Sequence, residues 1–180
     1  MGERTTAGLV TMTPVGACLR TGPGSLRDLA IITMLRALLT RAPRAQGIVL
    51  DLPEVISSAP AAERIQFVGG DFRASVPSGG DIYVLSHILR DWDDRGAHRI
   101  LDSCRRAAAT GTRLLIMEAV LAEQPGPVMP ELLSMHLLVM SGGGERTGDQ
   151  FRRLLESARW QLGQITPLPG GQSLLSARAS

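Results

Sequence analysis

The chain has 180 residues, of which 44% are hydrophobic and 20% charged. This is ordinary usage for one globular domain and excludes a disordered or fibrous class. Nineteen basic residues, all arginine, face 17 acidic ones, and a net charge of +2 gives no reason to expect nucleic acid. No stretch approaches the roughly 18 apolar residues of a membrane span, and the charged start MGERTTAG is unlike a signal peptide. We therefore expect a cytoplasmic protein with no membrane partner.

The first long element is a helix over residues 25–41. Residues 1–24 are rich in Thr, Gly and Pro and predict an extended arm. Ser25 is a suitable N-cap, and no Gly or Pro interrupts the apolar run before Pro43. Because apolar residues surround most of this helix, it must be buried on more than one side or have a partner.

Short β-branched runs then alternate with segments of helical spacing. The predicted strands are 47–50, 65–68, 81–85 and 112–120, with an antiparallel pair at 161–166 and 173–177. The predicted helices are one starting near Pro60, then 96–109, 128–140 and 147–158. Such alternation indicates an α/β fold with a mostly parallel sheet, whose ligands bind at the carboxyl ends of the strands.

Two acids follow neighbouring predicted strands, Asp51 after the first and Asp71 after the second. One carboxylate could accept hydrogen bonds from ribose hydroxyls and the other from the amino group of adenine, with Phe72 as a stacking face. Each aspartate could equally cap the turn that follows it. The two cysteines, Cys18 and Cys104, match no metal or redox spacing, so we expect free thiols and no metal.

Four segments, in this order, resemble the signatures of the plant-type and bacterial polyketide-type S-adenosylmethionine-dependent O-methyltransferases. They are 47–55 (GIVLDLPEV), 67–77 (FVGGDFRASVP), 81–94 (DIYVLSHILRDWDD) and 142–147 (GGGERT). The resemblance implies a truncated Rossmann-like methyltransferase domain at residues 35–180. Residues 11–27 resemble a piece of the family's dimerisation domain, so residues 1–34 are interpreted as its remnant, and a homodimer is implied.

The resemblance also implies the site and its ligands. The cofactor would be S-adenosylmethionine, with S-adenosylhomocysteine as product, and the acceptor a small aromatic molecule. Asp51 resembles the ribose-binding acid, Asp71 with Phe72 the adenine-binding pair, and Trp92 a residue lining the adenine pocket. The implied cofactor-binding set is Asp51, Leu52, Asp71, Phe72, Ser86 and Trp92. The implied catalytic set is His87, Arg90, Asp91, Glu118 and Glu145.

Two features depart from the family pattern. No acid and glycine-rich loop precedes Asp51, so we expect the sheet to lack its first strand. Arg90 stands where the family usually has a histidine base, and an arginine stays protonated. Glu118 and Glu145 match the acids that orient that histidine. His87, one helical turn before Arg90, could replace it or could be a packed or surface residue.

Three hypotheses about function follow. The first is an O-methyltransferase-like protein of secondary metabolism, such as antibiotic biosynthesis, that methylates a hydroxyl of an aromatic or polyketide small molecule with impaired activity. The alternative is a non-methylating binding or auxiliary module, or a repurposed scaffold, and the third is an inactive product. The absent glycine loop favours the last two, whereas the retained acids favour the first.

Overall fold

The computed structural model describes residues 8–12, 26–57, 59, 61–122 and 143–180. The strands are β1 Gly8–Met12, β2 Gln46–Asp51, β3 Ile65–Gly69, β4 Ile82–Ser86, β5 Arg113–Glu118, β6 Val120–Leu121, β7 Arg146–Thr147, β8 Trp160–Pro167 and β9 Ser173–Ala179. The helices are α1 Leu26–Arg41, α2 Pro53–Ile56, α3 Asp94–Ala107 and α5 Gly148–Ser157, with a 3₁₀ turn, η1, at Leu89–Asp91.

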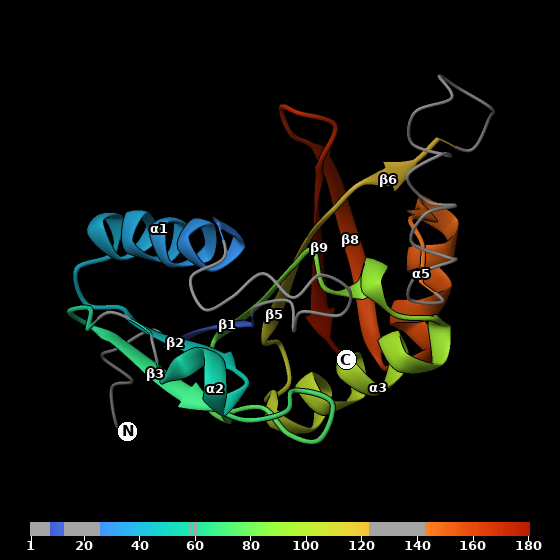
Figure 1. Cartoon of the computed structure of the whole chain (residues 1–180). Coiled ribbons are helices and arrows are strands. Elements are labelled where there is room, and N and C mark those ends of the chain that lie inside the picture. The colour runs from blue at the N-terminus through green and yellow to red at the C-terminus, as the bar shows by residue number, and fades with distance from the viewer. Residues whose placement is uncertain (1–7, 13–25, 58, 60, 123–142) are drawn as a thin grey trace.

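Seven of these strands form one sheet in the order β3-β2-β1-β4-β5-β9-β8 (Figure 1). Strands β1 to β5 run parallel, and β9 and β8 close the sheet as an antiparallel pair. β6 and β7 pair separately. The predicted α/β fold with a mostly parallel sheet and an antiparallel C-terminal pair is confirmed.

The expectation that the first strand is missing is wrong. β1 lies between β2 and β4, where Val10 pairs with both Ile48 and Tyr83. The Gly8 N–H also donates to a carboxylate oxygen of Asp81 at 2.7 Å. Residues 13–25, which connect β1 to α1, hold Gly16, Gly22 and Gly24 but lie outside the described residues.

The division of the chain at residues 34 and 35 falls within α1, which continues unbroken to Arg41. β1 comes from the first part and pairs with strands of the second. The described backbone of residues 8–12 therefore belongs to the same sheet as the rest. That residues 1–34 derive from a dimerisation domain stays a prediction.

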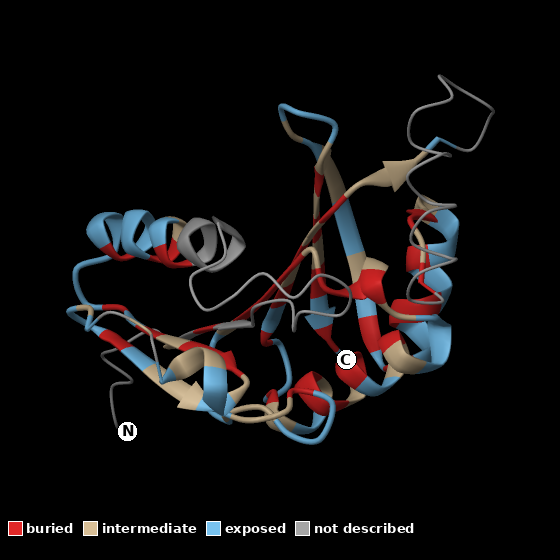
Figure 2. Ribbon diagram, viewed as in Figure 1, coloured by how far each residue is buried: buried red, intermediate tan, exposed pale blue. Residues whose placement is uncertain are grey.

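Both faces of the sheet carry an apolar layer, as parallel sheets require. Figure 2 shows the buried residues in red along the strands and the helices. On one face Leu35 and Leu39 of α1 pack with Val49, Ile65 and Val84. Figure 1 shows α3 on the opposite side from α1. There the cluster contains Tyr83 and Leu85 of β4, Ile100, Leu101 and Cys104 of α3, Phe151 and Leu155 of α5, and Trp160 of β8.

Cys104 is wholly buried in this second layer, and burial raises the pKa of its thiol to about 12. It is a free cysteine, as predicted. Trp160 is 1% exposed, and its indole N–H donates to the carbonyl of Leu101 at 3.0 Å, which joins β8 to α3.

In the described part of the chain, no helix has the length and apolarity to cross a membrane.

Two helices differ from expectation. The short helix expected near Pro60 is instead α2, which begins at Pro53, where a missing N–H has no cost in a first turn. The helix predicted over 128–140 falls on residues that the structure does not describe. By contrast α5 begins with a capping box, in which Thr147 and Gln150 each accept a hydrogen bond from the other's backbone N–H.

The C-terminal end of α1 depends on a side chain from a distant loop. Arg64 has a positive φ of 60°, and its Nη1 lies 3.0 to 3.4 Å from the carbonyls of Leu39, Ala42, Pro43 and Ala45. Leu39 lies in the last turn of α1, whose carbonyls have no partner within the helix. The guanidinium donates to the Leu39 carbonyl and opposes the negative end of the helix dipole.

We predict that Arg64→Met lowers the melting temperature by about 2–4 °C, the equivalent of roughly 1 kcal/mol. Methionine keeps the backbone cost of the positive φ but removes the donors. The matched control is Arg159→Met, because Arg159 has the same φ of 60° but only one 3.6 Å ion pair, with Asp102. Equal melting temperatures for the two variants would refute the capping role.

Candidate functional site

The carboxyl ends of β2 and β3 adjoin and bring their acids to one edge of the sheet. Asp51 ends β2 opposite Gly69, and the N–H of Gly70 donates to the Asp51 carbonyl at 2.8 Å. The Asp51 carboxylate is 1% exposed, and its Oδ1 accepts the N–H of Leu52 at 2.7 Å. Leu52 itself precedes the first turn of α2. Leu52 is the N-cap of α2 and the helix has no side-chain cap, so Asp51 bonds the residue before the helix without capping it.

Asp71 follows β3 by two residues and carries a bidentate ion pair with Arg73. Arg73 Nε donates to Oδ1 at 3.0 Å and Nη2 donates to Oδ2 at 2.7 Å, while its backbone N–H donates to Oδ1 at 2.9 Å. These hydrogen bonds hold the pKa of Asp71 below its usual range. The same guanidinium lies 4.9 Å from the centroid of the Trp92 ring. The structure therefore brings Asp71 and Trp92 together, with Arg73 touching both.

Phe72 does not present a stacking face. Its side chain is 0% exposed and belongs to the buried cluster beneath α3. A ring without an accessible face cannot stack on a nucleobase. The partly exposed indole of Trp92 is the aromatic surface at this edge instead.

The segment after β4 turns sharply at η1. Ser86 ends β4 and is 5% exposed, and His87 follows with a positive φ of 55°, its N–H donating to the Met117 carbonyl at 3.0 Å. A non-glycine residue in this region is uncommon and marks a constrained position. Asp91 lies within η1 and is 8% exposed.

Glu118, the last residue of β5, supports this turn from the sheet. One carboxylate oxygen, Oε1, accepts the N–H of Leu89 at 2.9 Å and that of Arg90 at 3.4 Å. The side chain is 1% exposed. Burial raises the pKa of Glu118 to about 7, although the charge of Arg90 acts in the opposite direction.

Arg90 is fixed by Glu145 on its other side. Arg90 Nη2 lies 3.4 Å from Glu145 Oε1, and the side chains are 13% and 2% exposed. The preceding glycines allow this approach: the N–H of Gly144 donates to the Arg90 carbonyl at 2.9 Å, and a Cβ on Gly143 would meet that carbonyl oxygen at 2.2 Å. Arg90, Glu118 and Glu145 therefore form one group around η1.

Comparison with known proteins shows the family of this chain. A model of the O-methyltransferase domain matches residues 31–161. The chain belongs to this O-methyltransferase domain family. It is 40% identical over 152 residues to phenazine O-methyltransferase PhzM of Lysobacter antibioticus, covering 81% of this chain and 45% of that protein. It is 40% identical over 152 residues to 3-amino-4-hydroxybenzoate 4-O-methyltransferase of Streptomyces cremeus, covering 80% of this chain and 42% of that protein.

Solved structures agree with this family membership. The crystal structure of LaPhzM superposes with a TM-score of 0.78 at 35% identity, covering 96% of this chain and 50% of that one. Human N-acetylserotonin methyltransferase in complex with SAM gives 0.77 at 26% identity, covering 96% and 47%. This O-methyltransferase domain thus spans about half the length of the curated relatives that it matches.

Sequence reasoning missed Arg146 in this O-methyltransferase domain. Its guanidinium donates to the carbonyls of Leu89 and Trp92 at 2.9 and 2.8 Å and pairs with Asp94 at 2.9 Å. At 6% exposure it is a buried cation, which is found only where partners satisfy it. Arg146 follows Glu145 in the sequence, which was a signal that it could lie at the site. The sequence did not show which groups its five guanidinium N–H donors would contact.

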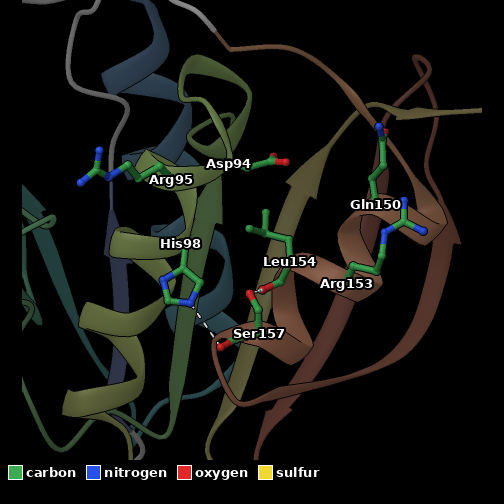
Figure 3. A pocket seen from close by; sticks show the side chains of 7 residues that line it. All are labelled: Asp94, Arg95, His98, Gln150, Arg153, Leu154 and Ser157. Carbon is green, nitrogen blue, oxygen red and sulfur yellow. Dashed lines mark hydrogen bonds between the residues drawn. The ribbon is translucent and has the colours of Figure 1, made fainter.

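The O-methyltransferase domain also has a cavity of about 480 Å³ between α3 and α5 (Figure 3). His98 and Ser157 face each other there, with His98 Nε2 3.2 Å from the Ser157 carbonyl, whereas Arg95 and Arg153 point away from one another. None of the predicted site residues lines it. Its lining is Asp94, Arg95, His98, Gln150, Arg153, Leu154 and Ser157.

Glu118 gives the site a pH dependence. Because its pKa is raised in the folded chain, the folded state binds more protons than the unfolded state between about pH 4.5 and 7. Its contribution to stability is therefore fully present below about pH 4.5 and is lost as the pH rises through about 7.

We predict that Glu118→Gln reduces the fall in melting temperature between pH 5 and pH 8, since the amide is neutral throughout. Thermal melts of both proteins across this range measure the difference. Glu156→Gln, at an exposed position of α5, is the control and should leave the wild-type slope unchanged. An unaltered slope in Glu118→Gln would show that burial does not raise this pKa.

Proposed function

We propose that the chain binds S-adenosylmethionine at the carboxyl edge of the sheet and methylates a hydroxyl of a small aromatic or polyketide molecule. The observation that carries the proposal is that Asp51 ends β2 and Asp71 follows the adjoining β3, with Arg73 between Asp71 and Trp92. The chain also belongs to the O-methyltransferase domain family. The relatives named above are methyltransferases, which supports this hypothesis over a non-methylating module.

The side chains at this edge of the sheet suit a nucleoside. Asp51 would accept hydrogen bonds from the ribose hydroxyls, Asp71 would accept one from the base, and Trp92 offers an aromatic face. Leu52 and Ser86 lie at the same edge, beside Asp51 and at the end of β4. The bound cofactor would supply a methyl group on a cationic sulfonium.

The acceptor would lie near η1, where Arg90 takes the place of a base. Arg90 stays protonated and can donate to an acceptor oxygen but cannot remove its proton. Glu118 is buried against backbone N–H groups, and Glu145 pairs with Arg90. We infer that the acceptor loses its proton to water and reacts as the anion, and that the chain contributes mainly by positioning it.

A location in the cytoplasm and a homodimer remain part of the proposal. A small aromatic acceptor of secondary metabolism is supported by the relatives' names, which refer to a phenazine and a hydroxybenzoate. His87 and Asp91, which flank the turn, are proposed to shape the acceptor side.

We predict that the chain binds S-adenosylhomocysteine and that Asp51→Asn weakens this binding about tenfold to a hundredfold, as expected for the loss of hydrogen bonds to a charged group. Isothermal titration calorimetry measures it. The matched control is Asp149→Asn on α5, whose exposed carboxylate pairs with Arg152. No binding by the wild-type chain at millimolar ligand would overturn the proposed function.

We further predict that the rate of methyl transfer to a series of ring-substituted hydroxybenzoates follows the acidity of the acceptor hydroxyl. Arg90→His supplies a base that titrates near neutral pH and should raise the rate for weakly acidic acceptors tenfold or more. Arg90→Gln, which has neither charge nor basicity, should not. Equal rates across the series in the wild-type chain would contradict reaction through the anion.

A further inference from the structure

Arg73 makes the two contacts that the proposed cofactor site reserves for a nucleobase. Its nitrogens donate to both carboxylate oxygens of Asp71, at 3.0 and 2.7 Å, and its Cζ lies over the Trp92 ring, 4.9 Å from the ring centroid. A guanidinium is planar and delocalised, with N–H donors along its edge and a face that stacks on aromatic rings. An adenine base has the same properties: an amino donor on its edge and a flat face.

The Arg73 side chain and a nucleobase cannot occupy the position between Asp71 and Trp92 at the same time. With Arg73 in place, both oxygens of Asp71 already accept hydrogen bonds, and the backbone N–H of Arg73 adds a third donor at 2.9 Å. The guanidinium also lies over the ring face of Trp92, where a stacked base would lie. A base that stacks on that face and bonds to Asp71 must first displace the Arg73 side chain.

This displacement need not disturb the backbone. The loop after Asp71 is held by its own hydrogen bonds, from the N–H groups of Ala74 and Ser75 to the Asp71 carbonyl at 2.9 and 3.1 Å. Arg106 of α3 donates to the carbonyl of Ala74 at 3.1 Å and fixes the loop from outside. The side chains of Arg73 and Asp71 are 46% and 36% exposed, so their ion pair is weak and the guanidinium can move into solvent.

We propose that Arg73 is an internal surrogate for the nucleobase, which occupies the Asp71–Trp92 position in the free chain and lowers its affinity for every adenosyl ligand. The inference rests on the proposed function, because it takes Asp71 and Trp92 as the base-binding pair. Arg73 is then a specificity-determining residue: only ligands with enough contacts elsewhere, such as those at Asp51, displace it.

The test is calorimetric titration of S-adenosylhomocysteine into the whole chain and into Arg73→Ala. An exposed ion pair and an exposed cation–π contact are each of modest strength, so Arg73→Ala should bind about threefold to tenfold more tightly. Arg152→Ala removes an arginine of similar exposure, 53% against 46%, from an ion pair on α5 and is the control; it should bind like the wild-type chain.

A double-mutant cycle separates competition from a general effect on the fold. If Arg73 competes through Asp71, the gain from Arg73→Ala should shrink in an Asp71→Asn background, because the neutral amide no longer holds the guanidinium. Equal or weaker binding by Arg73→Ala, with normal wild-type binding, would overturn the role of Arg73 and leave the proposed function standing. No binding by either protein at millimolar ligand would overturn both.

Discussion

The parallel pairing of β1 with two neighbours is the interaction on which the rest of the structure depends. Its five residues pair with β2, and four of them pair with β4 on the other side. The strand thus connects the half of the sheet that ends in Asp51 with the half that leads to η1. Without β1 both strands would have unpaired backbone groups inside the sheet, which are costly when buried. The relative position of the two halves of the site follows from this strand.

Local patterns predicted the elements that local chemistry determines. β2, β4, α3 and the hairpin of β8 and β9 follow from β-branched runs, helical spacing and the Pro169-Gly170-Gly171 turn, in which both glycines have a positive φ. β1 could not be predicted in this way. Gly-Leu-Val-Thr-Met is short and sits in a Thr- and Gly-rich arm, and it is a strand because two distant segments supply its partners.

The site shows the same division at the level of side chains. The resemblance placed Asp51, Asp71, Trp92, Arg90, Glu118 and Glu145 near one edge, and the structure brings Asp71 to Trp92 and Arg90 to both glutamates. It could not say that Phe72 turns into the core or that Arg73 covers Trp92. The direction in which a side chain points depends on packing against residues far away in the chain. A single sequence does not reveal that packing. Two charges of opposite sign bind the backbone of η1: Arg146 donates to the carbonyl of Leu89, and Glu118 accepts the Leu89 N–H.

The burial of Cys104 has a consequence for how opening of the fold can be followed. Its thiol lies in the layer between the sheet and α3, with 0% exposure and a pKa of about 12. Thiol reagents attack the ionised form at accessible sulfur, so alkylation of this residue must wait until α3 separates from the sheet. The rate at which iodoacetamide labels Cys104 therefore reports how often α3 separates from the sheet in the native chain. Peptide mass mapping distinguishes this labelling from that of Cys18.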